Sequence, residues 1–391
     1  MAFDFENRTI EELTAERSRK WSAFPGTIGM WVAEMDFGIS PEIRDYLIDE
    51  AHRGSLGYLP PHEADAILSA TSQWLSRFGW TPDTSRMLLL PEVLAGLRLT
   101  IEHFSTPGSP VIVPTPAYMP FLTIPGEFDR EVIEVPSLRG DDGLWHMDLE
   151  GIEAGFQRGA EVVVLCNPWN PTGRCLTREE LAALDALVTK YNGRVFEDAI
   201  HVPLILDGTY IPYATVSEQA PSHTITAVAS SKGWNIPGLK CAQLIFNNDA
   251  DWEAFKPHSH AATEPTSTVG ARAAGVCFTT SQQWNDDVRE YLRGNRDLLQ
   301  DRVAAWDGVS MAPVEGTYIT LLDFSELAGR GVFGGKNPAA FLRDEAGVAL
   351  TPGSACGSAY SDFARMIFAT PRHILVEALD RIERALYSSA K

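Results

Sequence analysis

The sequence contains little of what would place it in an oxidising compartment or a membrane. Its 391 residues include only five cysteines, and no two of them form a Cys-x-x-Cys pair. An odd, scattered set is typical of reduced thiols in a cytosolic protein, and it argues against a disulfide scaffold or a zinc site. No apolar run approaches the roughly 20 residues that a membrane-spanning helix needs.

Positive charge is also scarce. The chain has 32 Lys and Arg against 52 Asp and Glu, which gives a net charge of −20. Such an acidic balance argues against nucleic acid or an anionic membrane as a partner. The first residues, Met-Ala-Phe-Asp-Phe-Glu-Asn, lack the basic and apolar regions of an export signal. We therefore expect a cytoplasmic protein.

The order of apolar segments indicates the fold class. The chain is long enough for two domains that share a core. Between residues 85 and 250, short apolar runs typical of strands alternate with segments of helical spacing. This order predicts an α/β fold with a mostly parallel central sheet.

One lysine lies in a turn that could hold it close to a ligand. The segment from Ala229 to Lys240 reads Ala-Ser-Ser-Lys-Gly-Trp-Asn-Ile-Pro-Gly-Leu-Lys and follows a strand-like run. Desolvation and neighbouring positive charge would lower the pKa of its lysine, Lys232, making the amine a nucleophile toward a carbonyl and then a base. On this stretch alone, Lys232 can equally be a surface lysine in a turn.

Three further segments carry polar or anion-binding groups where strand-like runs end. The run 161–166 leads into Asn167-Pro-Trp-Asn-Pro-Thr-Gly173, and the run 193–198 ends in Asp198, with His201 three residues on. A third run ends near residue 90, and from Val93 the spacing becomes helical. The free N–H groups and the macrodipole at the start of such a helix would favour an anion such as phosphate.

Together these segments resemble those of fold-type I pyridoxal-phosphate (PLP) enzymes of the class I/II aminotransferase superfamily. The segment around Lys232 is similar to their Schiff-base lysine segment, Ser-x-Ser-Lys-x-Phe-Asn-x-x-Gly-Leu, and Asn-Pro-x-Asn-Pro-Thr-Gly is among their most recognisable loops. Lys20-Trp21 followed by Gly29-Met-Trp-Val-Ala-Glu-Met-Asp-Phe-Gly38 resembles the start of one branch, the C–S β-lyases (MalY/PatB, cystathionine β-lyase-like).

The resemblance covers essentially the whole chain, and it implies a fold and a domain division. The expected fold is aspartate aminotransferase-like: a large domain with a mostly parallel central sheet and a smaller α+β C-terminal domain. Residues 1–45 would form an N-terminal arm and part of the small domain. Residues 46–283 would form the large PLP-binding domain, and residues 284–391 the C-terminal small domain.

The resemblance also implies which residues contact the cofactor ring. Lys232 would bond the cofactor and later act as the base, and Asp198 would keep the pyridine nitrogen protonated. Tyr118, from the segment Pro-Ala-Tyr-Met-Pro-Phe, would lie against the ring, where an aromatic face holds it by stacking. Asn170 and His201 would contact the phenolic oxygen.

Two further sets of residues follow from the resemblance. The cofactor phosphate would be held by Val93, Leu94, Ser231, Lys240 and, across the interface of a homodimer, by Tyr58 of the partner subunit. The α-carboxylate of an amino-acid substrate would be received by Arg365, Ala33 and Asn170. Arginine suits that task because its guanidinium can bind a carboxylate with two parallel hydrogen bonds. No metal is expected.

The sequence departs from the family pattern at four positions. The usual Pro-Gly-Val-Val is Pro91-Glu-Val-Leu here, and a carboxylate at Glu92 would repel a phosphate. Either Glu92 turns outward, or the phosphate is held differently. Ala229, Ala199 and Ile367 replace a serine, a glutamate and an asparagine of the family.

The activity implied is PLP-dependent β-elimination from L-cysteine S-conjugates such as cystathionine, giving a thiol, pyruvate and ammonia. An aminotransferase would use the same residues, so that alternative stays open. The departures could also mark a tailoring enzyme for a bulky S-cysteinyl conjugate, including decarboxylating chemistry. A regulatory protein that binds PLP without catalysis is a further alternative, although the matched catalytic residues speak against it.

Overall fold

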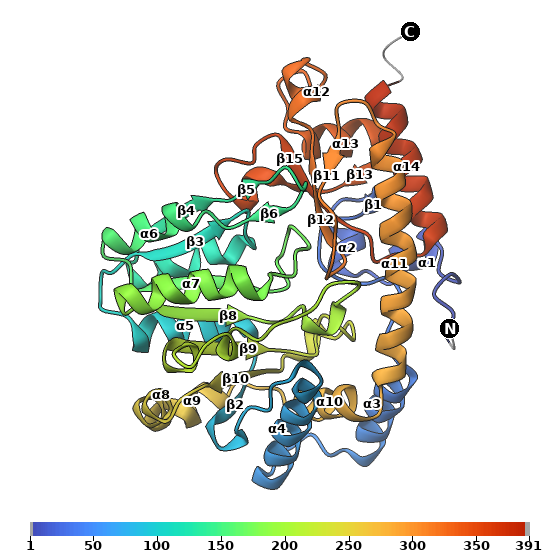
Figure 1. Cartoon of the computed structure of the whole chain (residues 1–391). Helices are drawn as coiled ribbons and strands as arrows, with labels where there is room; N and C mark the ends of the chain where they lie inside the picture. The colour runs from blue at the N-terminus through green and yellow to red at the C-terminus, as the bar shows by residue number, and fades with distance from the viewer. Residues whose placement is uncertain (1–2, 388–391) are drawn as a thin grey trace.

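The structure is a computed structural model that describes residues 3–387. A seven-stranded sheet lies at its centre, in the order β2-β10-β9-β8-β7-β3-β4, and β10 alone runs antiparallel to its neighbours in this sheet (Figure 1). The predicted α/β fold with a mostly parallel central sheet is confirmed. The strands are β2 (Met87–Leu90), β3 (Val111–Thr115), β4 (Val132–Pro136), β7 (Val162–Cys166), β8 (Arg194–Asp198), β9 (Thr224–Val228) and β10 (Ala242–Phe246).

Helices pack against this sheet, which explains why most of its strands are buried along their whole length rather than at alternate residues. Every residue of β7, Val-Val-Val-Leu-Cys, is buried. Helix α5 packs across β8, β9 and β10, and α6 packs on β3 and β4. The helices of this part are α3 (Pro41–Arg53), α4 (Pro61–Leu75), α5 (Val93–Phe104), α6 (Leu149–Gln157), α7 (Arg178–Tyr191), α8 (Asp249–Phe255), α9 (Ser259–Thr263) and α10 (Thr268–Thr279).

A second, antiparallel sheet is built mainly from the last quarter of the chain, in the order β11-β12-β15-β14. Its strands are β11 (Ser310–Met311), β12 (Ile319–Asp323), β14 (Thr351–Pro352) and β15 (Phe363–Ile367). Three helices accompany it: α12 (Ser325–Gly329), α13 (Pro338–Ala346) and α14 (Arg372–Tyr387). Near residue 30, β1 (Ile28–Gly29) pairs with β13 (Val348–Ala349), so the N-terminal segment joins this part, and the division at residues 45 and 283 stays a prediction. A hairpin of β5 (Leu138–Arg139) and β6 (Trp145–His146) lies beside it.

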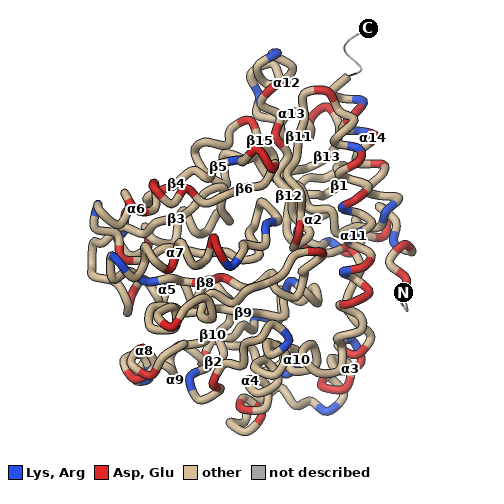
Figure 2. Tube along the Cα trace, viewed as in Figure 1, with Lys and Arg blue, Asp and Glu red and all other residues tan. Residues whose placement is uncertain are grey.

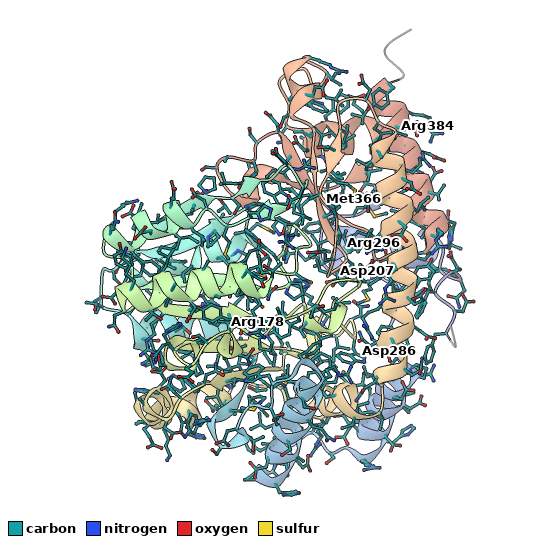
Figure 3. All side chains as sticks on the ribbon, in the orientation of Figure 1. Arg178, Asp207, Asp286, Arg296, Met366 and Arg384 are labelled. Atoms are coloured by element: carbon teal, nitrogen blue, oxygen red, sulfur yellow. The ribbon has the colours of Figure 1, made fainter. Side chains whose placement is uncertain are left out.

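The long helix α11 (Gln282–Ala304) runs along both parts of the molecule (Figure 1). The helical, highly charged spacing from Trp284 to Trp306 predicts a long helix here, and the structure confirms it. Arg296 of α11 forms an ion pair with Asp207, and the two side chains lie together in Figure 3. Arg293 binds the same carboxylate at 3.2 Å and also donates to the carbonyl of Leu206. These contacts tie α11 to the loop that follows β8.

Two expected elements differ from the structure. The sequence from Thr9 to Arg19 predicts one short polar helix, and this prediction is wrong: α1 (Ile10–Ala15) and α2 (Arg19–Ser22) are separated at Arg17, whose φ of 57° is left-handed and ends a helix. The run from Val314 to Phe324 predicts an extended strand, but the observed strand is shorter, because β12 begins only at Ile319. Thr317, just before it, has a φ of 63° that no strand residue adopts.

The N-terminal motif, Lys20-Trp21 with residues 29–38, forms a largely buried segment that we call the N-terminal block. Lys20 Nζ lies 2.7 Å from Asp36 Oδ2, and the indole N–H of Trp21 donates to Asp36 Oδ1 at 2.8 Å. Both members of this ion pair are almost fully buried. The Lys-Trp and Met-Asp-Phe parts of the motif therefore hold the arm together.

Charged residues lie mostly on the outer elements, while the strands of the central sheet are largely uncharged (Figure 2). Within residues 3–387, no helix is long and apolar enough to cross a membrane.

Candidate active site

A cavity of about 630 Å³ lies where the ends of the central strands face the second sheet and the N-terminal block. Its lining includes eleven of the twelve residues expected at the site. These are Ala33, Val93, Leu94, Tyr118, Asn170, Asp198, His201, Ser231, Lys232, Lys240 and Arg365. Asp198 ends β8, Asn170 follows β7, Lys232 follows β9, and Arg365 comes from β15.

Lys232 is held by the N-terminal block. Its Nζ donates to the carbonyl of Ala33 at 2.9 Å, and the hydroxyl of Tyr318 donates to the same carbonyl at 3.0 Å. Asn235, three residues on, bonds both the N–H and the carbonyl of Met35, so the lysine loop and the block are clamped together. Burial first, and the positive charge of Arg365 next, lower the pKa of Lys232 to about 8. The amine is therefore partly neutral near pH 7, as a base requires.

Asp198 is the last residue of β8, and His201 follows it by three residues. Asp198 is 3% exposed, and its Oδ1 accepts from the N–H of Ile200 at 3.0 Å. Burial raises the pKa of this carboxyl to about 7, although the N–H of Ile200 and the charge of Lys232 oppose the rise. A cation in the cavity would keep it ionised at neutral pH. His201 Nδ1 lies 2.9 Å from the Thr317 hydroxyl, and burial holds the pKa of the imidazole well below its usual value, so the ring is neutral.

Arg365 is a buried cation without an acid beside it. It is 2% exposed, and no carboxylate of residues 3–387 lies within ion-pair distance. Its Nη2 donates to the carbonyl of Trp31 at 2.9 Å, its Nη1 lies 3.3 Å from Asn170 Oδ1, and its Nε has no acceptor. Burying an unpaired charge is costly, so this geometry points to an anionic ligand.

Tyr118 and Ser231 also line the cavity. Tyr118 is half-buried and packs edge-on against Phe121 at 5.6 Å. Burial raises the pKa of its hydroxyl, so the ring is uncharged. Ser231, beside Lys232, is also half-buried at the cavity wall.

The far end of the cavity is more open and carries an unexpected ion pair. Helix α5 begins at Val93, and the first N–H groups of a helix, here those of Val93 and Leu94, have no intrahelical acceptor. Glu92 precedes them and does not turn outward: it lines the cavity, and its Oε2 accepts from Lys240 Nζ at 2.7 Å. Arg98 lies 3.8 Å from its other oxygen. At the end of the cavity where the phosphate is expected, Lys240 therefore already binds the carboxylate of Glu92.

Tyr58 is the expected residue that lies apart. It stands in the loop between α3 and α4, is 98% exposed and does not line the cavity. Within residues 3–387 its side chain forms no hydrogen bond, and its role across an interface stays a prediction.

Sequence reasoning missed several residues that shape the cavity. Tyr318 and Trp31 hold the carbonyl of Ala33 and the guanidinium of Arg365, and Thr317 orients His201. Their contacts join segments more than a hundred residues apart, so no local pattern could indicate them. Arg19 and Glu34 also line the cavity. They adjoin the motif residues Lys20 and Ala33, and that adjacency was the available signal.

The donor set fits pyridoxal phosphate. Lys232 offers an amine of lowered pKa, Asp198 a buried acid that needs a cation, and the start of α5 free N–H groups for a phosphate. Arg365 remains for the carboxylate of an amino acid. The cavity volume is in the range of sites that enclose a small ligand.

Comparisons with known proteins agree with this geometry. The family model described as aminotransferase class I and II matches residues 26–382. A cystathionine β-lyase of Corynebacterium glutamicum is 36% identical over 378 residues, covering 96% of this chain and 99% of that protein. A Corynebacterium diphtheriae structure, provisionally described as a PLP-dependent β-cystathionase, is 34% identical with a TM-score of 0.90, covering 98% and 99% of the two chains. Cystalysin from Treponema denticola, which contains pyridoxal 5′-phosphate, is 25% identical with a TM-score of 0.89 over the full length of both chains.

Proposed function

The chain belongs to the aminotransferase class I and II family, and on that premise we propose that it is a PLP-dependent carbon–sulfur β-lyase. Its substrates are L-cysteine S-conjugates of the cystathionine type, which it converts with water to a thiol, pyruvate and ammonia. The observation that carries the proposal is the buried, acid-free Arg365 in one cavity with Lys232, whose amine has a lowered pKa. The names and full-length similarity of the relatives support the choice of a lyase.

The chain's own groups divide the work between binding and proton transfer. Pyridoxal phosphate, when bound, supplies a carbonyl that bonds the substrate amine and a pyridinium that withdraws electrons from the α-carbon. Arg365 binds the α-carboxylate, and Asn170, 3.3 Å from its guanidinium, fixes its orientation. Asp198 holds the proton on the pyridine nitrogen, since a buried carboxylate and a cation stabilise each other's charge.

Lys232 takes the proton from the substrate α-carbon. Its amine is held 2.9 Å from the Ala33 carbonyl, in a wall that also contains Tyr318, so it stays in one place when it is not bonded to a ligand. Because its pKa is about 8, it can accept a proton near neutral pH and return it to a leaving group. Departure of the thiolate from the β-carbon distinguishes the lyase from an aminotransferase.

A product analysis tests the proposal. The PLP-loaded protein is mixed with L-cystathionine or S-ethyl-L-cysteine, and the products are identified by mass spectrometry. We expect pyruvate, ammonia and free thiol in equal amounts, and none from a Lys232→Ala variant. An intact S-substituted keto acid together with pyridoxamine phosphate would mean transamination, and the lyase proposal would be wrong.

We further propose that the enzyme acts as a cytoplasmic homodimer in which each Tyr58 reaches the cofactor phosphate of the partner subunit. Tyr58 is 98% exposed, and Leu56 and Ile48 near it are 66% and 48% exposed. Exposed apolar side chains of this kind are typical of an interface. All five cysteines are free thiols, which supports a reducing compartment. Sedimentation equilibrium would show a dimer, and a Tyr58→Phe variant should remain dimeric but bind PLP less tightly.

A further inference from the structure

Two side chains at the cavity wall, Arg19 and Glu34, have opposite charges that nothing in the described chain neutralises. The guanidinium of Arg19 forms no ion pair or hydrogen bond within residues 3–387, and it lies over the ring of Trp31, 5.6 Å from the ring centre. The carboxylate of Glu34 likewise has no partner there. Glu92 and Lys240, at the open end of the cavity, by contrast pair with each other. The catalytic roles proposed above use neither Arg19 nor Glu34.

The scaffold around Lys20 fixes both residues relative to the substrate-binding arginine. The backbone carbonyl of Lys20 accepts from the indole N–H of Trp31 at 3.1 Å, and Lys20 Nζ donates to the carbonyl of Glu34 at 3.1 Å. The carbonyl of Trp31 in turn accepts from Arg365 at 2.9 Å. Trp31 therefore contacts both arginines: its ring faces Arg19, and its backbone carbonyl binds Arg365. The buried ion pair of Lys20 with Asp36 holds this segment in place.

Both charges act on the interior of the cavity. Burial raises the pKa of Tyr118, and the positive charges of Arg365 and Arg19 oppose that rise. Burial and Arg365 lower the pKa of Lys232, and the negative charge of Glu34 opposes that fall. Both residues belong to the lining of the same cavity as Tyr118 and Lys232.

Resting on the proposed lyase function, we propose that Arg19 and Glu34 form a subsite for the far end of the substrate and determine its specificity. Arg19 binds a distal carboxylate, and Glu34 binds a distal ammonium. The preferred substrates are then cysteine S-conjugates whose leaving thiol carries its own amino-acid head group. Conjugates with an uncharged alkyl tail bind at Arg365 alone. Trp31 supports the distal carboxylate by holding the guanidinium over its ring.

The test uses non-cleavable analogues in which a methylene replaces the sulfur, so that binding is measured without elimination. The probes are L-norleucine with a neutral tail, L-2-aminopimelate with a carboxylate tail, L-lysine with an ammonium tail and L,L-2,7-diaminosuberate with both. Their inhibition constants are measured on the PLP-loaded protein, with turnover of the substrate on which it is most active as the assay. Arg19→Met keeps a chain over the Trp31 ring without the charge, and Glu34→Gln keeps the size of the side chain.

We expect Arg19→Met to raise the inhibition constants of aminopimelate and diaminosuberate about tenfold, the effect of losing one charge-assisted contact, and to leave that of norleucine within about twofold. Glu34→Gln should raise the inhibition constants of lysine and diaminosuberate about tenfold and leave that of norleucine within about twofold. Arg19→Glu should reverse the preference, favouring lysine over aminopimelate. Arg44→Met, an exposed arginine paired only with Asp45 among the described residues, is the matched control and should change none of the four.

Uniform changes across all four probes, or no change with aminopimelate in either Arg19 variant, would overturn the subsite. This outcome is separable from failure of the proposed function. If the assay substrate gives a keto acid instead of pyruvate, the lyase proposal fails, while the inhibition constants still report whether the distal charges are recognised.

Discussion

Two buried arginines of this protein have opposite surroundings. Arg174 and Arg365 are both 2% exposed. Arg174 binds Glu180 with Nη2 at 2.8 Å and Glu315 with Nη1 at 2.7 Å, so its charge is neutralised within the fold. Arg365 has only carbonyl, hydroxyl and amide oxygens around it, and its Nε is left without an acceptor. Arg174 therefore stabilises the fold, whereas the charge of Arg365 is free to bind an anionic ligand.

The lysines repeat the contrast. Lys20 is buried against Asp36 at 2.7 Å, whereas Lys232 contacts a backbone carbonyl and has a pKa lowered to about 8. A buried charge that lacks a counter-charge destabilises the fold unless a ligand supplies the missing partner. The comparison therefore points to the active site without any motif, because Arg365 and Lys232, two cations that form no ion pair with an acid among residues 3–387, both line the cavity.

The largest expected effect separates the two lysines. Lys232→Met should reduce pyruvate formation by about 10³-fold or more, since it removes the group that moves the α-proton. Lys20→Met should instead leave Asp36 buried without a cation and lower the free energy of unfolding by about 3–5 kcal/mol. Pyruvate assays and urea unfolding measure the two effects. Lys190→Met, at an exposed position of α7, is the control and should change neither. A Lys20 variant as stable as the wild type would break the comparison.

The arginines should separate in the same way with a smaller effect on activity. Arg365→Met should lower kcat/KM about 100-fold, because the α-carboxylate loses its charge-assisted hydrogen bonds. It should not lower stability by more than about 1 kcal/mol, since no acid loses its partner. Arg174→Met should lower the unfolding free energy by several kcal/mol because Glu180 and Glu315 both lose their arginine. Kinetics on S-ethyl-L-cysteine and denaturation by urea measure both. Equal loss of stability in the two variants would contradict the distinction.

In the protein without PLP, the cost of burying the charge of Asp198 should make the free energy of unfolding depend on pH. The folded pKa of about 7 lies above the usual 3.8, so the folded state binds more protons between these values and stability falls as the pH rises from about 4 to about 7. Asp198→Asn removes this loss and should unfold with a free energy on the order of 3 kcal/mol higher at pH 8, with no difference near pH 4. Asp45→Asn, at an exposed position, should show no such trend. A constant difference at all pH values would mean that burial of the charge is not the cause.

Much of the site could be predicted from the sequence because its residues follow strands. The run Val-Val-Val-Leu-Cys leads to Asn170, and the run ending at residue 198 leads to Asp198, so a correct strand prediction places both at one edge of the sheet. Helix α5 begins at Val93 as its spacing indicated. The pattern Thr177-Arg-Glu-Glu180 predicts a capping box at the start of a helix, and these two end residues cap α7. These features depend on neighbours within a few residues.

What failed depends on distant contacts or single backbone angles. The helix break at Arg17 and the late start of β12 follow from left-handed residues that no composition rule specified. The partners of Ala33, Lys232 and Arg365 come from segments up to several hundred residues away. The conflict between Glu92 and a phosphate was visible in the sequence, but its resolution by Lys240 required the structure.

The smallest expected effect concerns the open end of the cavity, where two charged residues are paired with each other and yet line the site. Lys240 and Glu92 neutralise each other at 2.7 Å, yet both line the site, and their side chains are 54% and 40% exposed. Because the carboxylate competes with a phosphate for Lys240, Glu92→Gln should tighten PLP binding by the apo protein about fivefold, within the range of exposed ion pairs. Lys240→Met should weaken it by a similar factor. Binding of pyridoxal, which has no phosphate, should not change in either variant. Weaker PLP binding by Glu92→Gln would instead show that the carboxylate holds Lys240 in place for the phosphate, and the pair would then belong to the scaffold like that of Arg174.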